Sequence, residues 1–314
     1  MNIEGIKVVD ATLRDGGLVN DFYFSDEFVK KLYEANVAAG VDYMEFGYRA
    51  DKAQFDVDKF GKWKFTSDED VRCVVGENRT KTKISVMVDV GRCDYKNDIR
   101  PKSESPVDLF RVATYIETIP EAIEMIRYID ALGYETTCNL MAISRCTDEQ
   151  VAWAMEQLAN SPVMGVYVVD SYGTLYPKQT RHLARLYYDI LAPVGKLVGI
   201  HAHNNQQCAF ANTVEAKGCG AKLLDATAYG MGRGAGNCHL EALLGYLNGK
   251  KYHVEPMLDF VEQYMLPLRE QSVWGYNTSY LLTGLTNQHP RTAIAATKNN
   301  ETNFKEQYQF LSYE

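Results

Sequence analysis

Short apolar runs alternate with longer amphipathic segments along the first 250 residues of the chain. The runs are rich in Val, Ile and Leu and are bounded by turn residues, a pattern that indicates buried strands. They lie at residues 6–13, 42–48, 84–90, 109–116, 135–141, 166–170, 197–203 and 223–229. The segments between them place apolar residues three and four positions apart, as amphipathic helices do. Helices are therefore expected at residues 25–39, 119–132, 147–159, 177–191, 205–217 and 237–247.

Repeated alternation of strands and helices predicts a parallel sheet, and eight strands is the number that closes a (β/α)8 barrel. We therefore assign the chain to the α/β class, with a TIM-barrel catalytic domain over residues 1–250. The pattern is weakest at 52–83, where the second helix is unclear and an extra loop is expected. After residue 250 the periodicity is helical only, at 257–268 and 274–285. This predicts a C-terminal helical appendage over residues 251–314 rather than a ninth repeat.

Composition and charge narrow the classes of partner. The 314 residues carry a formal net charge of −8, which argues against nucleic acid, because phosphate backbones attract basic surfaces. No apolar stretch approaches the roughly 20 residues that a membrane helix needs. The N-terminal sequence MNIEGIKVVDATL lacks the features of a signal peptide. The seven cysteines are scattered and have no CxxC spacing, which favours reduced thiols. These features predict a cytoplasmic protein that binds neither nucleic acid nor membranes.

Chemistry in a TIM barrel takes place at the carboxyl ends of the strands, so polar residues at those ends are the site candidates. The first strand leads into DATLRDGG, the second contains MEFG, the sixth leads into VVDSYGT and the seventh ends in HAH. The candidates are Asp10, Arg14, Asp15, Glu45, Asn139, Asp170, Ser171, His201 and His203.

His201 and His203 predict a metal site at the barrel mouth. Side chains at positions i and i+2 of a strand point to the same face, so both imidazoles would face the mouth. With one carboxylate, which Asp15 can supply, they would bind a divalent metal and leave coordination positions open for substrate and water. The alternative is a pair of hydrogen-bonded core histidines or of solvent-facing ones.

Arg14 stands beside the predicted ligand Asp15. A guanidinium next to a metal is repelled unless an anion neutralises both, which predicts an anionic substrate that develops charge on an oxygen, as an enolate does. An ordinary surface arginine is the alternative. Glu45 would orient Arg14 or form an ion pair in the barrel floor. We interpret the glycine-rich loop at 230–236 as a tight turn that brings Asn237 to the metal, because no Lys-Ser/Thr follows it as in a phosphate-binding loop.

Together these motifs resemble the DRE-TIM metallolyase superfamily, whose HMG-CoA lyase-like barrels include 4-hydroxy-2-oxovalerate aldolase and isopropylmalate and homocitrate synthases. The resemblance is carried by DATLRDGG, YMEFG, VVDSYGT, GIHAHNN and GMGRGAGNCHLEALLGYL, in this order over most of the chain. The serine after Asp170 and the stretch MLPLREQSVWGYNTSYLLTGL at 265–285 are similar to the 4-hydroxy-2-oxovalerate aldolase branch.

The resemblance implies a metal-dependent, class II aldolase. It would cleave a 4-hydroxy-2-oxoacid to pyruvate and an aldehyde through a metal-bound enolate, without a Schiff-base lysine. Mn²⁺ is the first expectation for the metal, with Mg²⁺, Co²⁺ or Zn²⁺ as alternatives. The implied partners are a small 2-oxoacid substrate, an acylating aldehyde dehydrogenase and further copies of the chain in a homo-oligomer.

The resemblance also implies roles for individual residues. The metal ligands would be Asp15, His201 and His203, with Asn237 as the fourth ligand of the HMG-CoA lyase branch. The catalytic residues would be Arg14, which stabilises the enolate, with Glu45 and Tyr276. The substrate-binding residues would be Arg14, Ser171 at the pyruvate carboxylate, and Tyr280.

Three features depart from the family pattern. Leu18 occupies the position of the histidine that acts as base in the aldolases. Arg233 stands where the glycine loop of HMG-CoA lyases has a cysteine, and the sequence after Gly284 matches nothing in the family. The candidates for the base are then Asp21, Asn20 through a water, Tyr48, Tyr276 and a metal-bound hydroxide.

Two other functions stay open at this stage. The first is a Claisen-type acyl-CoA synthase or lyase, similar to isopropylmalate synthase or HMG-CoA lyase, which a substrate screen with and without acetyl-CoA would separate from an aldolase. The second is a non-catalytic barrel that acts as a scaffold or partner subunit, which the missing histidine would fit.

Overall fold

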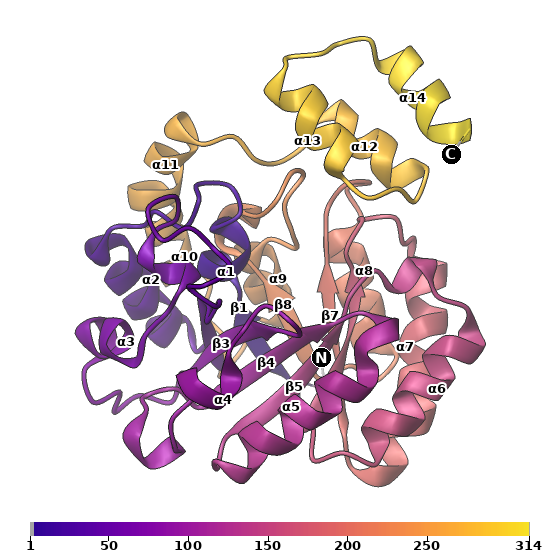
Figure 1. Ribbon diagram of the computed structural model, residues 1–314. Coiled ribbons are helices and arrows are strands. Elements are labelled where there is room, and N and C mark those ends of the chain that lie inside the picture. Colours follow the sequence, from indigo (N-terminus) through magenta and orange to yellow (C-terminus); the bar gives the residue numbers. More distant parts are fainter. Residues whose placement is uncertain (1–2, 314) are drawn as a thin grey trace.

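The computed structural model describes residues 3–313 and contains a closed barrel of parallel strands (Figure 1). The strands are β1 (Lys7–Asp10), β2 (Tyr43–Tyr48), β3 (Lys83–Asp89), β4 (Leu109–Thr114), β5 (Glu135–Leu140), β6 (Gly165–Asp170), β7 (Leu197–Ala202) and β8 (Leu223–Ala226). Each strand pairs with the next one along the chain, and β8 pairs with β1 to close the barrel. The predicted (β/α)8 barrel is confirmed, and the carboxyl ends of all eight strands therefore meet at one face.

Helices surround the barrel and begin at caps that the sequence supplies. Ser25 accepts a hydrogen bond from the Phe28 N–H at 3.1 Å at the start of α2, and Thr147 forms a capping box with Gln150 at the start of α6. The helices are α1 (Thr12–Gly16), α2 (Asp26–Ala39), α3 (Asp68–Val75), α4 (Tyr95–Asp98), α5 (Ile119–Ala131), α6 (Asp148–Ala159), α7 (Pro177–Leu191), α8 (Ala209–Gly218) and α9 (Leu240–Leu247).

The structure differs from the sequence pattern near the start of the chain. β1 ends at Asp10 rather than at residue 13, because the Asp10 carboxylate accepts a hydrogen bond from the Thr12 N–H at 2.9 Å and the chain turns into α1. The second helix, α3, lies within the weak stretch 52–83 and begins at a capping box between Ser67 and Asp70. α3 has only eight residues and a polar first turn, so few apolar positions mark it in the sequence.

The C-terminal part is helical, as predicted. It contains α10 (Glu255–Phe260), the π-helical turn η7 (Val261–Met265), α11 (Leu266–Gln271), α12 (Thr278–Leu285), α13 (Arg291–Lys298) and α14 (Phe304–Tyr313). α10 packs against α2 at the side of the barrel, whereas α13 and α14 both pack against α12 (Figure 1, yellow). The Thr174 hydroxyl in the loop after β6 donates to the Gly284 carbonyl, which anchors α12 at the carboxyl face. Within residues 3–313, no helix has both the length and the apolar character needed to cross a bilayer.

The barrel interior contains a layer of polar side chains where TIM barrels usually carry branched apolar ones. The even-numbered strands each contribute one buried residue: Glu45, Arg111, Tyr167 and Asp225. Arg111 forms ion pairs with both carboxylates, and its guanidinium lies over the Tyr167 ring, 4.4 Å from the centroid. The apolar core lies between the strands and the surrounding helices. The layer thus contains one cation and two carboxylates, and Arg14 supplies a second positive charge to Glu45.

Candidate active site

Two histidines and an aspartate converge at the carboxyl face of the barrel. His201 lies in β7, His203 follows that strand directly, and Asp15 lies in α1. All three side chains are buried, and their ligand atoms lie within 4.8 Å of one another. The Asp15 Oδ2 atom is 3.2 Å from His201 Nε2 and 3.4 Å from His203 Nε2. The structure thus brings together the three residues that the sequence predicts as metal ligands.

The second ring nitrogen of each histidine is held by an acceptor. His201 Nδ1 lies 2.9 Å from the Asp225 carboxylate, and His203 Nδ1 lies 3.1 Å from the Asp170 carbonyl oxygen. Because an ionised carboxylate and a carbonyl only accept, each Nδ1 carries a proton, and a neutral ring presents its Nε2 lone pair to Asp15. Lone pairs that face a carboxylate oxygen across such distances need a proton or a cation between them. This donor set suits a divalent metal.

Charges around these residues keep the aspartate ionised. Burial alone would raise the pKa of Asp15, but Arg14 and His203 hold it well below its usual range. Burial lowers the pKa of His203, which keeps its Nε2 lone pair free. Burial and Arg14 oppose protonation of His201, but its hydrogen bonds with Asp15 and Asp225 raise its pKa. A divalent cation would take the place of a proton between Asp15 and His201.

Asn237 approaches the same cluster from the glycine-rich loop. Its backbone forms a β-bridge with His203, and its Oδ1 atom is buried without a hydrogen-bond partner, as is the Oδ1 atom of Asp15. A Cβ atom at Gly232 would lie 2.0 Å from Asn237 Nδ2 and 3.4 Å from the Asp15 carboxyl carbon. Glycine is therefore required at this position for Asn237 to come so close. Buried oxygens without a hydrogen-bond partner are suited to bind a cation.

Arg14 is connected to the cluster of Asp15, His201 and His203, hereafter the metal cluster, through the interior polar layer. Its Nε atom donates to Glu45 Oε2 at 3.0 Å, and Arg111 donates to the same oxygen at 2.8 Å. Arg111 also pairs with Asp225, which in turn holds His201. Arg14 itself lies 3.5 Å from Asp15 and 3.4 Å from His201 Nε2. One continuous network therefore orients both Arg14 and His201.

The sequence reasoning missed Arg111 and Asp225. Each is a single charged residue within an otherwise apolar strand, in LFRVAT and in LLDA. A charge in such a place is costly unless it is paired, so the two positions together could have indicated an ion pair inside the barrel. Their pairing with one another and with Glu45 depends on the barrel closing.

We expect Arg111→Met to lower the free energy of unfolding by about 3–5 kcal/mol, the usual cost of removing one partner of a buried ion pair. The variant leaves Glu45 and Asp225 buried without their shared cation. Urea unfolding followed by circular dichroism measures the change, with Arg127→Met on the exposed face of α5 as the control. A loss smaller than about 1 kcal/mol, the size of an average substitution, would show that the network does not support the fold.

Two neighbouring cavities open at the carboxyl face. The inner cavity, of about 70 Å³, is lined by Arg14, Asp15, Leu18, Tyr48, Met87, Ala113, Asn139, Met141, Val169, Ser171, His201, His203 and Arg233. The outer cavity, of about 350 Å³, is lined by Leu18, Val19, Arg233, Gly234, Val273, Trp274, Gly275, Tyr276, Asn277, Tyr280, Ile294 and Thr297. Leu18 and Arg233 line both, so they stand at the boundary between the two cavities.

The predicted substrate contacts divide between these cavities. Ser171 lines the inner cavity, and its Oγ atom accepts a hydrogen bond from the Ala142 N–H at 2.8 Å, which leaves its own hydroxyl proton free. Tyr280 is buried and Tyr276 is 61 % exposed, and both line the outer cavity. The structure therefore places Ser171 with the metal cluster and the two tyrosines beyond Leu18.

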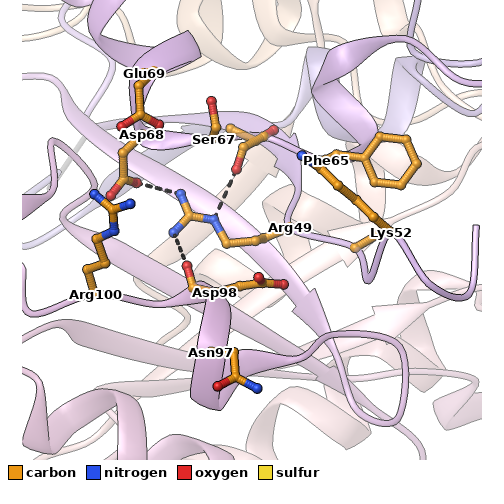
Figure 2. A pocket seen from close by; sticks show the side chains of 11 residues that line it. Arg49, Lys52, Phe65, Ser67, Asp68, Glu69, Asn97, Asp98 and Arg100 are labelled. Atoms are coloured by element: carbon orange, nitrogen blue, oxygen red, sulfur yellow. Dashed lines mark hydrogen bonds and ion pairs between the residues drawn. The ribbon is translucent and has the colours of Figure 1, made fainter. Parts of the chain in front are cut away.

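A separate cavity of about 260 Å³ lies beside the loops that follow β2 and β3 (Figure 2). At its centre, the buried guanidinium of Arg49 donates to the carbonyl oxygens of Thr66 and Asp98 and pairs with the Asp68 carboxylate. These bonds engage the Arg49 guanidinium and tie α3 to the end of α4. Its charge is already matched by Asp68, so this cavity does not compete with the barrel mouth as the reaction site.

Comparison with known proteins agrees with the geometry. An oxaloacetate decarboxylase of Mycobacterium tuberculosis is 30% identical over 261 residues, which cover 80% of this chain and 73% of that protein. A 4-hydroxy-2-oxovalerate aldolase of Mycolicibacterium smegmatis is 29% identical over 259 residues, which cover 82% and 72%. The crystal structure of the N-terminal domain of a candidate aldolase from Bacteroides vulgatus superposes with a TM-score of 0.77 at 26% identity, covering 98% of this chain and 97% of that one.

A more distant structure shares the fold. HMG-CoA lyase of Brucella melitensis has a TM-score of 0.68 at 17% identity, covering 84% of this chain and 99% of the lyase. Residues 5–266 match the HMGL-like family, and that match spans the whole barrel and the start of the C-terminal helices. The chain therefore belongs to the HMGL-like family and is a metal-dependent carbon–carbon lyase.

Proposed function

We propose that the protein cleaves a 4-hydroxy-2-oxoacid to pyruvate and an aldehyde, with a divalent metal held by Asp15, His201, His203 and Asn237. The observation that carries this proposal is the set of buried ligand atoms of Asp15, His201 and His203 that face one another beside Arg14. Mn²⁺ is the metal we propose first, and Mg²⁺, Co²⁺ or Zn²⁺ would suit the same nitrogen and oxygen donors. When bound, the metal would act as a Lewis acid that polarises the 2-oxo group.

The names of the two relatives at about 30% identity support the same class of reaction. Retro-aldol cleavage of a 4-hydroxy-2-oxoacid and decarboxylation of oxaloacetate both break a bond to C3 and leave the electron pair on a pyruvate enolate. A site that stabilises this enolate therefore serves either reaction. We also propose, from the family resemblance alone, that the protein forms a homo-oligomer and passes its aldehyde to an acylating aldehyde dehydrogenase.

Arg14 would stabilise the charge that develops during cleavage. In the reaction the 4-hydroxyl proton passes to a base, the C3–C4 bond breaks, and its electron pair moves to the C2 oxygen. Glu45 holds the Arg14 guanidinium at Nε, and the Nη atoms lie 3.5 Å from Asp15 Oδ2 and 3.4 Å from His201 Nε2, beside the inner cavity. A planar, fixed donor placed where charge develops favours the transition state over the ground state. A proton returned to C3 then gives pyruvate.

Two hydroxyls line the inner cavity with Arg14. The Ser171 hydroxyl would donate a hydrogen bond to the carboxylate of the substrate. Burial raises the pKa of Tyr48 although Arg14 opposes this shift, so its phenol keeps its proton at neutral pH. Tyr48 is therefore suited to donate a hydrogen bond to a substrate oxygen, and less suited to act as the base.

Substitutions of Tyr276 and Leu18 test which group acts as the general base. Tyr276 lies in the outer cavity and is 61 % exposed, so we expect Tyr276→Phe to leave kcat nearly unchanged. Leu18 lines the inner cavity near Arg14, so we expect Leu18→His to raise kcat for pyruvate release, by up to the roughly 10²-fold that a positioned base contributes. Both are measured by coupling pyruvate to lactate dehydrogenase.

The opposite outcome for each variant would contradict these expectations. A drop of about 10²–10⁴-fold in Tyr276→Phe would identify that phenol as the base. An unchanged or lower rate in Leu18→His would mean that the pocket at Leu18 is adapted to a substrate other than a simple 4-hydroxy-2-oxoacid.

The function itself is tested by metal analysis followed by pyruvate release. The purified protein would be loaded with Mn²⁺ and supplied with a panel of 4-hydroxy-2-oxoacids, with and without acetyl-CoA. We expect pyruvate and an aldehyde without acetyl-CoA, and no pyruvate after removal of the metal. Turnover that requires acetyl-CoA would support the Claisen-type alternative. Metal binding without any turnover would support a non-catalytic role.

A further inference from the structure

Arg233 projects from the glycine-rich loop between β8 and α9 to the boundary of the two cavities. Its guanidinium donates to the Ser171 carbonyl oxygen at 3.0 Å. The loop is held tightly at the next residue, because Gly234 has a φ of +62° and a Cβ atom there would lie 2.2 Å from the Tyr280 ring. Arg233 is therefore positioned by the backbone around it and not by a charged partner.

Among the described residues Arg233 has no carboxylate partner, in contrast to Arg14 and Arg111. Arg14 and Arg111 both pair with the buried carboxylate of Glu45. Within residues 3–313, no carboxylate lies within ion-pair distance of Arg233. Its positive charge acts on Tyr172, His203, Tyr280 and His289, whose side chains carry no negative charge at neutral pH.

Two further arginines add positive charge in the same region. Burial raises the pKa of Tyr172, and the charges of Arg145, Arg233 and Arg291 oppose this shift. A group of arginines at one edge of the mouth is notable in a chain whose net charge is −8. Bringing a guanidinium close to a metal site costs free energy unless an anion lies between them. The edge of the mouth is thus suited to a negatively charged group.

The position of Arg233 indicates which part of the substrate carries that group. Arg14 lines only the inner cavity, together with the metal cluster, whereas Arg233 lines both cavities. In the proposed function, on which this inference rests, the 2-oxo group and its carboxylate occupy the inner cavity. A group that reaches the boundary with the outer cavity belongs to the far end of the substrate.

We propose that Arg233 binds a second carboxylate at the far end of the substrate, so that the protein acts on 2-oxo dicarboxylates in preference to 2-oxo monocarboxylates. Arginine binds a carboxylate through two parallel N–H donors, and such charge-assisted pairs are stronger than neutral hydrogen bonds. Arg233 is thus a residue that determines specificity, and the reaction that consumes its product receives an aldehyde or acid carrying a negative charge.

The test compares two unreactive ligands that differ only at the far end. 2-Oxoglutarate and 2-oxovalerate have five carbons and the same 2-oxo-carboxylate head, but the first ends in a carboxylate and the second in a methyl group. Isothermal titration calorimetry with the Mn²⁺-loaded protein measures both affinities without turnover. We expect 2-oxoglutarate to bind about 10- to 100-fold more tightly, the range for one hydrogen bond to a charged group.

Three variants complete the experiment. Arg233→Met should remove the preference by weakening 2-oxoglutarate alone, and Arg233→Lys, which keeps the charge, should retain part of it. Arg127→Met removes a charge from the exposed face of α5 and should change neither affinity. Circular dichroism and metal content confirm that each variant is folded and loaded.

Several outcomes would overturn the inference. Equal affinities in the unmodified protein, or no binding of 2-oxoglutarate, would exclude a site for a second carboxylate. An equal loss for both ligands in Arg233→Met would mean that Arg233 contacts the first carboxylate. Failure of the proposed function would give a different result. No 4-hydroxy-2-oxoacid would then release pyruvate, whereas the affinities for 2-oxoglutarate and 2-oxovalerate could still be measured.

Discussion

Replacing His201 with alanine is expected to abolish bound metal and pyruvate release together. His201 contributes one of two Nε2 lone pairs to the cluster, and its ring is held by Asp225 on the other side. Loss of a residue that merely orients a ligand costs about 10–100-fold in metal affinity, so loss of the ligand itself should cost at least the upper end of this range. Metal content after dialysis, measured by inductively coupled plasma spectrometry, is compared directly with the rate.

The matched control for this variant is His182→Ala. His182 is an exposed histidine on α7 that pairs with Asp148, so its removal changes the histidine content without touching the barrel mouth. Metal content and rate should both stay at the level of the unmodified protein. If His201→Ala retains full metal occupancy while His182→Ala behaves as expected, the assignment of the metal site is wrong.

Arg14→Lys is expected to lower kcat by about 10²–10³-fold, the range for losing one fixed donor to a developing negative oxygen. Lysine keeps the positive charge but cannot donate to Glu45 and to a substrate oxygen in one plane. The change in KM should be smaller, because the interaction strengthens mainly in the transition state. Steady-state kinetics with the best substrate of the panel separates the two constants.

The fold should survive this substitution. Glu45 remains paired with Arg111, so no buried carboxylate loses its only partner. Arg127→Lys on the exposed face of α5 is the control for an arginine-to-lysine change elsewhere. A kcat like that of the unmodified protein in Arg14→Lys would exclude the proposed role in the transition state, and a rise in KM alone would assign Arg14 to substrate binding.

Leu18, which replaces the histidine of the aldolase pattern, lies at the boundary between the two cavities. Leu18 is 40 % exposed and lies between the metal cluster and the apolar space under the C-terminal helices. A histidine there would be within the inner cavity, which agrees with the role of that position in the family. With leucine, the boundary is apolar on one side and carries the charge of Arg233 on the other. Leucine at position 18 therefore cannot act as the base, and it also changes the shape of the passage between the two cavities.

Much of the site is local in the sequence and was predictable for that reason. The alternation of apolar runs and amphipathic segments determines a (β/α)8 barrel, because each period reports directly on burial. The spacing of His201 and His203 places both rings on one face, and Asp15 and Arg14 follow the first strand. Since the carboxyl ends of the strands meet at one face, these residues had to converge once the barrel was recognised.

Only the tertiary structure decided what these residues contact. Arg111 and Glu45 are 66 positions apart, and their pairing requires that β2 and β4 face the same interior. The location of Tyr276 beyond Leu18, and the absence of an acidic partner for Arg233 within residues 3–313, depend on the paths of the loops and of the C-terminal helices. Periodicity reports which face of an element is buried, whereas the partner of a buried charge is set by closure of the barrel and by the packing of segments that are distant in the chain.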